Sequence, residues 1–75
     1  MIRYLNLGGD SGVAAYANNE GLIEVQFSDG WIYRYTNQSA GKMVIDEMKR
    51  LAIAGRGLNS YIGRVVKKRY ESKRR

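Results

Sequence analysis

The sequence predicts an α+β fold in which a small antiparallel sheet of two or three strands packs against two C-terminal helices. Residues 22–27 and 31–36 alternate apolar with polar side chains, which is the period of a half-buried strand. After residue 39 the apolar residues recur every three or four positions, as in an amphipathic helix, and this pattern returns after residue 57. A chain of 75 residues suits one small domain.

The first strand is predicted at residues 13–17, after a loose N-terminal segment. Three of the five residues in 8–12 are glycine, so we expect residues 1–12 to be flexible and to lie outside the folded domain. Residues 18–21, Asn-Asn-Glu-Gly, indicate a turn because asparagine and glycine tolerate a positive φ.

The turn between the two alternating strands decides which side chains share a face. A two-residue loop at Asp29 and Gly30 would place the aromatic residues on the polar face of the preceding strand. A three-residue loop, a type I turn followed by Gly30 in a left-handed bulge, would instead pair Phe27 with Trp31. The hydrophobic pattern favours the three-residue loop, because it collects the large apolar side chains on one face. That face carries Ile23, Val25, Phe27, Trp31, Tyr33 and Tyr35.

Two helices are predicted to follow the sheet. The first runs from about residue 40 to residue 54, with Ser39 as its N-cap and Gly55 as its left-handed stop. The second has an apolar stripe, since residues recur at helical spacing at Leu58, Tyr61, Ile62, Val65 and Arg69. The folded domain is therefore expected to span residues 13–70, followed by a basic C-terminal tail at residues 71–75 that frays.

The composition excludes several classes of site. There is no cysteine and no histidine, so disulfides, thiolate-bound metals and imidazole chemistry are absent. Asp46 and Glu47 are neighbours on a predicted helix and point in different directions, so they form no acid–base pair. We expect a non-enzymatic protein with no cofactor, no metal and no small-molecule substrate. The apolar stretches are too short for a membrane span, and the lack of cysteine suits the cytoplasm.

Positive charge is concentrated at the C-terminal end. Residues 1–55 hold five basic and six acidic side chains, whereas residues 56–75 hold eight basic side chains and one acidic one. The first part therefore carries a net charge of −1 and the last twenty residues carry +7. This asymmetry is typical of a protein that binds a polyanion.

Two stretches carry motifs of a known family: IEVQFSDGWIYRY at residues 23–35 and GRGLNSYIGRVVKKRY at residues 55–70. Together they resemble the KTSC domain, a small module found alone in bacterial and phage-type proteins and at the C-terminus of some lysyl-tRNA synthetases. The resemblance covers most of the chain, roughly residues 11–70. RNA binding has been suggested for this family, so the resemblance favours RNA over DNA as the partner.

The candidate nucleic-acid contacts combine basic side chains with two tyrosines. Phosphate contacts are expected from Arg34, Arg56, Arg64, Lys67, Lys68 and Arg69, and base stacking from Tyr33 and Tyr35. Each has a structural alternative. Trp31, Tyr33 and Tyr35 could form a wall of the core, Arg34 could pair with Glu24 across the strands, and the Arg56 segment could be a corner between helices.

These observations predict a non-catalytic accessory module that binds nucleic acid, RNA in preference to DNA, through a basic C-terminal helix. The alternative from another class is a protein-interaction module, for example a homodimer formed by pairing of an exposed sheet edge. An acidic protein or an anionic lipid surface would also attract the basic residues.

Overall fold

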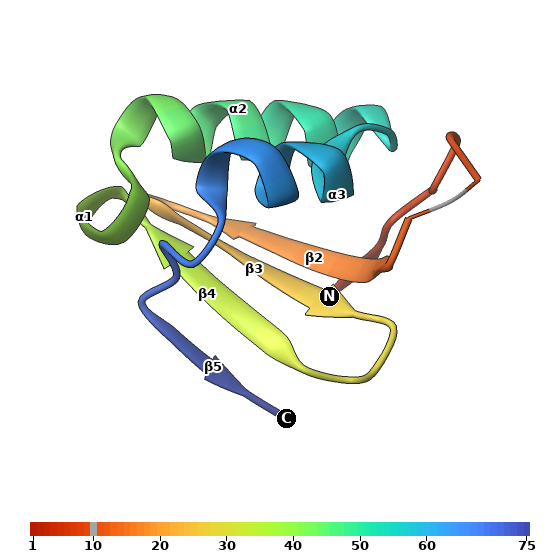
Figure 1. The fold of residues 1–75 in the computed structure, drawn as a ribbon, viewed down its shortest axis with the longest axis horizontal. Coiled ribbons are helices and arrows are strands. Elements are labelled where there is room, and N and C mark those ends of the chain that lie inside the picture. The colour runs from red at the N-terminus through yellow and green to blue at the C-terminus, as the bar shows by residue number, and fades with distance from the viewer. Residues whose placement is uncertain (10) are drawn as a thin grey trace.

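The computed structural model of the chain describes residues 1–9 and 11–75, and it is an α+β fold with two layers (Figure 1). One layer is a five-stranded antiparallel sheet whose strands follow one another in sequence order. The strands are β1 (Ile2–Arg3), β2 (Val13–Asn19), β3 (Leu22–Phe27), β4 (Ile32–Thr36) and β5 (Ser72–Arg74). The second layer contains α1 (Asn37–Ala40), α2 (Lys42–Ala54), α3 (Leu58–Tyr61) and the π-helix η1 (Ile62–Val66).

The sheet is larger than the two or three strands predicted, because both ends of the chain join it. At the N-terminal end, Tyr4 is only 3% exposed, and its hydroxyl accepts a hydrogen bond from the Leu58 N–H at 3.3 Å. At the other end, β5 pairs with β4, and the Glu71 N–H donates to the Arg34 carbonyl at 2.6 Å. Residues 2–4, from the segment expected to be flexible, and residues 72–74, from the tail expected to fray, therefore belong to the folded domain. Asp10, in the same N-terminal segment, lies outside the described residues.

The register of the central hairpin is the predicted one. The Phe27 N–H donates to the Trp31 carbonyl and the Gly30 N–H donates to the Phe27 carbonyl, both at 2.9 Å. Gly30 has a φ of 93°, the left-handed conformation that the three-residue loop requires. Val25 consequently pairs with Tyr33, and the predicted apolar face points toward the helices. The strand predicted before this hairpin is present as β2, but it continues through Asn18 and Asn19, so the predicted turn is confined to Glu20 and Gly21, with Gly21 at a φ of 73°.

The core lies between the inner face of the sheet and the helices. Its largest side chains, each less than 2% exposed, come from β3, β4, α2, α3 and η1, so every layer contributes to it. They are Ile23, Val25, Tyr35, Ile45, Met48, Leu58 and Val66. The helices cover one face of the sheet only (Figure 1). No helix in the described part of the chain is long and apolar enough to cross a membrane.

The first predicted helix is present as α2, whose N-cap is Gly41 with no side-chain hydrogen bond, so the prediction of Ser39 as its N-cap was wrong. Ser39 lies in the short helix α1, whose N-cap is Thr36: the Thr36 hydroxyl accepts from the Ser39 N–H, and the Ser39 hydroxyl accepts from the Thr36 N–H, both at 3.0 Å. Gly41, at a φ of 96°, then interrupts the helix before α2 begins. The predicted stop at Gly55 is confirmed, since this residue is left-handed and its N–H donates to the Leu51 and Ala52 carbonyls.

The second predicted helix is shorter than expected and has a different register. It changes from α to π geometry at Ile62, and the Lys67 N–H closes it by donating to the Ile62 carbonyl at 2.5 Å. The wider turn brings Val66 into the core with no exposed surface, whereas Val65, which the sequence placed in the apolar stripe, is 41% exposed. The basic residues 67–69 therefore lie in a turn and not on a helix.

This register predicts unequal effects for two neighbouring valines. Val66→Ala is expected to lower the free energy of unfolding by about 2 kcal/mol, because it removes two buried methyl groups and leaves a cavity. Val65→Ala is expected to change it by less than about 0.5 kcal/mol. Urea unfolding of both variants measures the two changes in unfolding free energy. Because both replace valine with alanine, the effect of helix propensity is the same, and the difference between them reports the burial of the side chain. Equal losses would contradict the π-helical register.

Candidate nucleic-acid interface

An open groove of about 640 Å³ lies between the end of the helical layer and the β3–β4 hairpin. Two kinds of side chain dominate its lining. Three are lysines and four are aromatic rings, of which Tyr35 is almost wholly buried. We refer to the site formed by the other six side chains as the aromatic–lysine groove: Phe27, Tyr33, Tyr70, Lys67, Lys68 and Lys73. Two of these lysines were predicted contacts, and the third comes from the C-terminal strand that the sequence did not reveal.

The rings of the groove form a continuous set centred on Tyr33. The ring of Tyr33 meets Phe27 edge to face, with centroids 5.2 Å apart, and meets Tyr70 in the same way at 4.9 Å. Tyr33 is half-buried, so part of its ring lines the groove while the rest packs against the core. The Tyr33–Tyr70 contact also fixes the turn that carries Lys67 and Lys68 beside the sheet.

Lys73 lies over three rings at once. Its Nζ atom is 5.3 Å from the centroid of Trp31, 5.8 Å from that of Tyr33 and 5.9 Å from that of Tyr70. The Arg75 guanidinium lies over Trp31 as well, at 5.3 Å. Cations within about 6 Å of a ring centroid are attracted by the ring quadrupole. The basic end of the chain is thereby held against the aromatic strand.

Tyr35 is among the residues that line the groove, but it does not present the stacking surface that was predicted. Its ring is 1% exposed, stacked beside Tyr33 at 6.4 Å and covered by Tyr70 at 6.3 Å. A ring with no free face cannot stack on a base. The structural alternative, a ring in the core wall, is the correct one for this residue, whereas Tyr33 and Trp31 keep partial exposure.

Arg34 lies on the opposite face of the sheet from the groove. Its Nε atom is 3.2 Å from Oε2 of Glu24, and Nη1 of Arg74 lies 2.6 Å from the same oxygen. The cross-strand ion pair is therefore the correct alternative for Arg34, with Arg74 from β5 as an unexpected third member. Glu24 is 8% exposed, since these two arginine side chains cover it on a face that no helix covers.

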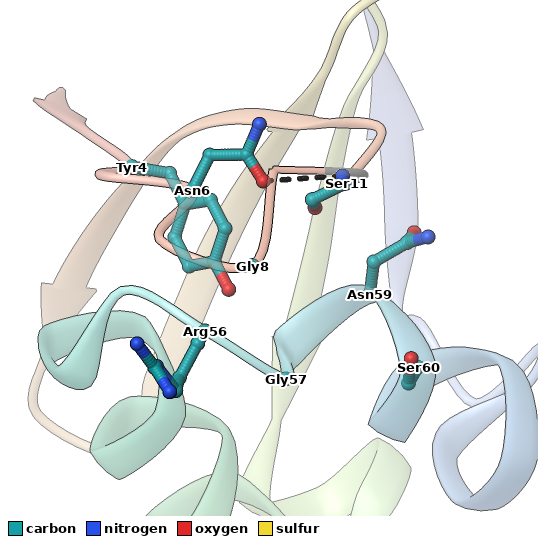
Figure 2. Close-up of a pocket in the computed structure, with 8 residues that line it drawn as sticks. All are labelled: Tyr4, Asn6, Gly8, Ser11, Arg56, Gly57, Asn59 and Ser60. Carbon is teal, nitrogen blue, oxygen red and sulfur yellow. Dashed lines mark hydrogen bonds between the residues drawn. The ribbon is translucent and has the colours of Figure 1, made fainter.

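The remaining predicted arginines lie outside the groove. Arg56 lines a separate small pocket of about 130 Å³ beside the N-terminal segment, together with Tyr4, Asn6 and Ser60 (Figure 2). Arg64 and Arg69 are exposed on and just after η1. Within residues 1–9 and 11–75, neither Arg64 nor Arg69 forms an ion pair. The structure thus brings four predicted residues to one groove and leaves Arg34 and Arg56 elsewhere. The four are Lys67, Lys68, Tyr33 and the almost wholly buried Tyr35.

Glu24 gives the molecule a pH dependence that can be measured. The hydrogen bond from Arg74 holds the pKa of Glu24 below its ordinary value of 4.5, aided by the bond from Arg34 and opposed by burial. A carboxyl whose pKa is lowered by folding stabilises the protein above its unfolded pKa, and this contribution is lost as the pH falls.

We therefore expect the wild-type protein to lose more stability between pH 7 and pH 3 than Glu24→Gln, in which the carboxyl is absent. Urea unfolding of both proteins at the two pH values tests this, because the other carboxyls titrate in both. An equal loss in the two proteins would mean that the Arg34–Glu24–Arg74 cluster contributes nothing to the pH dependence.

No protein-family model, curated protein or solved structure matches this chain. The class of ligand that suits the groove is therefore inferred from the side chains that line it. Its lining includes one carboxylate, Asp29, which is already engaged in the hairpin turn because it accepts the Trp31 N–H at 3.0 Å. Among residues 1–9 and 11–75, no cluster of acidic side chains could hold a metal ion. The groove offers ammonium groups and ring faces, a combination that suits anionic ligands with aromatic parts.

Three residues of the groove were not among the predicted contacts. Phe27 was assigned to the core, Tyr70 was assigned to no site, and Lys73 was included only as a member of the basic tail expected to meet a polyanion. The available signal was the sequence KKRYESK at residues 67–73, in which a tyrosine follows and a lysine closes the basic run. Their place beside Tyr33 depends on the pairing of β5 with β4, which no local pattern indicated.

Proposed function

We propose that the protein is a non-catalytic module that binds single-stranded nucleic acid in the aromatic–lysine groove, with RNA preferred to DNA. The observation that supports this most strongly is the convergence of Lys67, Lys68 and Lys73 on one groove lined by Phe27, Tyr33 and Tyr70. These lysines form no ion pair within residues 1–9 and 11–75, so their charge is available to a ligand.

The lysines supply affinity for the phosphate backbone. A Lys that neutralises a phosphate releases condensed counterions, which makes binding depend on salt. Arg64 and Arg69, both exposed near the turn that holds Lys67 and Lys68, extend the positive surface beyond the groove. Arg34 and Arg74 are excluded from this role, since Glu24 neutralises part of their charge on the other face of the sheet.

The rings favour a single strand over a duplex. Single-stranded bases can turn outward and stack on aromatic side chains, whereas the bases of a duplex are already stacked on one another. The accessible part of Tyr33 and the ring of Tyr70 lie inside a groove rather than on a protruding surface. The preference for RNA, and a cytoplasmic location, are supported by the resemblance to the KTSC domain and by the absence of cysteine.

A fluorescence-polarisation titration with salt as the variable tests the proposal. Labelled single-stranded RNA is compared with single-stranded DNA, duplex DNA and heparin, each at low and at moderate salt. We expect the single-stranded RNA to bind most tightly, with a slope of log K against log salt near −2, as three contacts at about −0.7 each would give. Tightest binding to heparin would indicate a general polyanion surface, and negligible binding at both salts would contradict the proposal.

A further inference from the structure

The groups that hold β5 in place come from parts of the chain that precede it. β4 offers its backbone edge, to which Ser72, Lys73 and Arg74 pair opposite Arg34, Tyr33 and Ile32. On the outer face of the sheet the Glu24 carboxylate forms an ion pair with Arg74 at 2.6 Å. On the inner face the Lys73 ammonium lies over the rings of Trp31 and Tyr33. All of these groups precede η1 in the chain, so a β5 strand from another copy would meet the same contacts.

The connection between η1 and β5 is short and has an unfavourable conformation at its first residue. Lys67 has a φ of 52° and a ψ of −123°, a region that glycine adopts readily and residues with a Cβ atom rarely do. The closed monomer imposes this conformation, because the chain must reverse between Val66 and β5. An extended connection would release it.

We propose that two copies of the chain exchange their C-terminal segments, residues 70–75, so that β5 of each copy pairs with β4 of the other. Exchange keeps the Arg74–Glu24 ion pair and the contacts of Lys73, and it lets residues 67–69 extend. Short connections under strain favour this type of exchange. Pairing of two β5 edges side by side is disfavoured instead, because both edges carry Lys73, Arg74 and Arg75. This inference goes beyond the proposed binding of nucleic acid.

A charge-reversal experiment distinguishes exchange from any other dimer. In the Glu24→Arg variant the side chains at positions 24 and 74 of one chain are both positive. In the Arg74→Glu variant both are negative. In a mixture, each strand meets an oppositely charged site only if it is donated to the other chain. The two full-length variants, freed of nucleic acid, are refolded separately or together at high concentration, and light scattering after size exclusion gives the dimer fraction.

The expected result is a dimer fraction at least about tenfold higher in the mixture than in either variant alone. Circular dichroism shows whether each variant is folded. As a second test, the dimer fraction of a chain that carries only Lys67→Gly is compared with that of the wild type. Glycine relieves the connection in the closed monomer, so this substitution is expected to lower the wild-type dimer fraction. A monomeric mixture of folded variants, or a dimer fraction that Lys67→Gly leaves unchanged, would overturn the proposal. Neither result depends on nucleic-acid binding.

Discussion

Replacing Lys67, Lys68 and Lys73 together with glutamine is expected to weaken the binding of single-stranded RNA about 100-fold at 0.1 M salt. The estimate follows from the loss of three phosphate contacts, each of which contributes about 0.7 to the slope of log K against log salt. The same variant should therefore show a slope reduced by about 2. Polarisation titrations at four or five salt concentrations measure both quantities, and circular dichroism confirms that the variant is folded.

A matched control removes the same amount of charge elsewhere. Lys42, Lys49 and Arg50 lie on α2, where Lys42 pairs with Asp46, Arg50 pairs with Glu47 and the Lys49 ammonium donates to the Asn19 carbonyl. None of the three lines the groove. Replacing these three with glutamine is expected to leave RNA affinity within a few fold of the wild type. An equal loss in both triple variants would mean that net charge, and not the groove, determines binding.

Tyr35→Ala is expected to lower the free energy of unfolding by about 3–5 kcal/mol, the usual cost of removing a large buried aromatic ring. A chain of this size has a total stability of roughly 4–11 kcal/mol, so the loss removes from about a quarter of that stability to all of it. Tyr35 is among the largest fully buried side chains, and it packs beside Tyr33 and Tyr70. Urea unfolding followed by circular dichroism measures the loss.

The conservative variant Tyr35→Phe separates the ring from its hydroxyl. It is expected to remain folded and to differ from the wild type mainly at alkaline pH. Burial raises the pKa of Tyr35 well above its ordinary value of 10.0, with smaller contributions from Tyr33 and Tyr70. Above pH 10 the unfolded chain loses this proton while the folded chain retains it, so the wild type loses stability as the pH rises and Tyr35→Phe loses less.

A different result at this position would change the interpretation of the whole strand. If Tyr35→Ala kept its stability but lost RNA affinity, Tyr35 would be an exposed stacking platform, and the inward orientation of the β3–β4 face would be wrong. If the wild type and Tyr35→Phe lost stability equally above pH 10, the tyrosine hydroxyl would not be buried in the folded protein.

The features that could be predicted from the sequence are those determined by local chemistry. The hairpin register follows from the alternation around Gly30, because a slip of one residue would expose Phe27 and its neighbours on that face. The end of α2 at Gly55 follows from the same kind of local rule, since glycine adopts the left-handed conformation without a steric penalty. The concentration of positive charge near residues 67–75 was likewise visible in the sequence.

The features that could not be predicted depend on contacts between distant segments. β5 has three exposed residues and no apolar alternation, so nothing local marks it as a strand. It pairs with β4, where Arg74 reaches Glu24 and Lys73 lies over the rings of Trp31 and Tyr33. The greater burial of Tyr35 compared with Tyr33 could not be predicted for the same reason. Alternation places both rings on one face of the sheet, but the positions of the helices and of Tyr70 determine which ring is covered.

The π-helical turn is a further example. Helical periodicity predicts that Val65 joins Leu58 and Ile62 in the core, and an α-helix would indeed place it there. The wider turn of η1 moves Val66 into that position, which ends the helix before the basic residues. Lys67 and Lys68 consequently lie at the mouth of a groove beside Tyr33, where a continuous helix would have carried them past the sheet.

The most direct test of the central claim is a map of the backbone amide signals that move when a short single-stranded RNA is added to the isotope-labelled full-length chain. If the groove binds RNA, the largest changes will fall on residues 27–33, 67–70 and 73, and the Trp31 indole signal will move with them. Changes confined to α2, to the outer face around Glu24 and Arg34, or to the pocket of Arg56 would contradict the assignment of the aromatic–lysine groove as the nucleic-acid site.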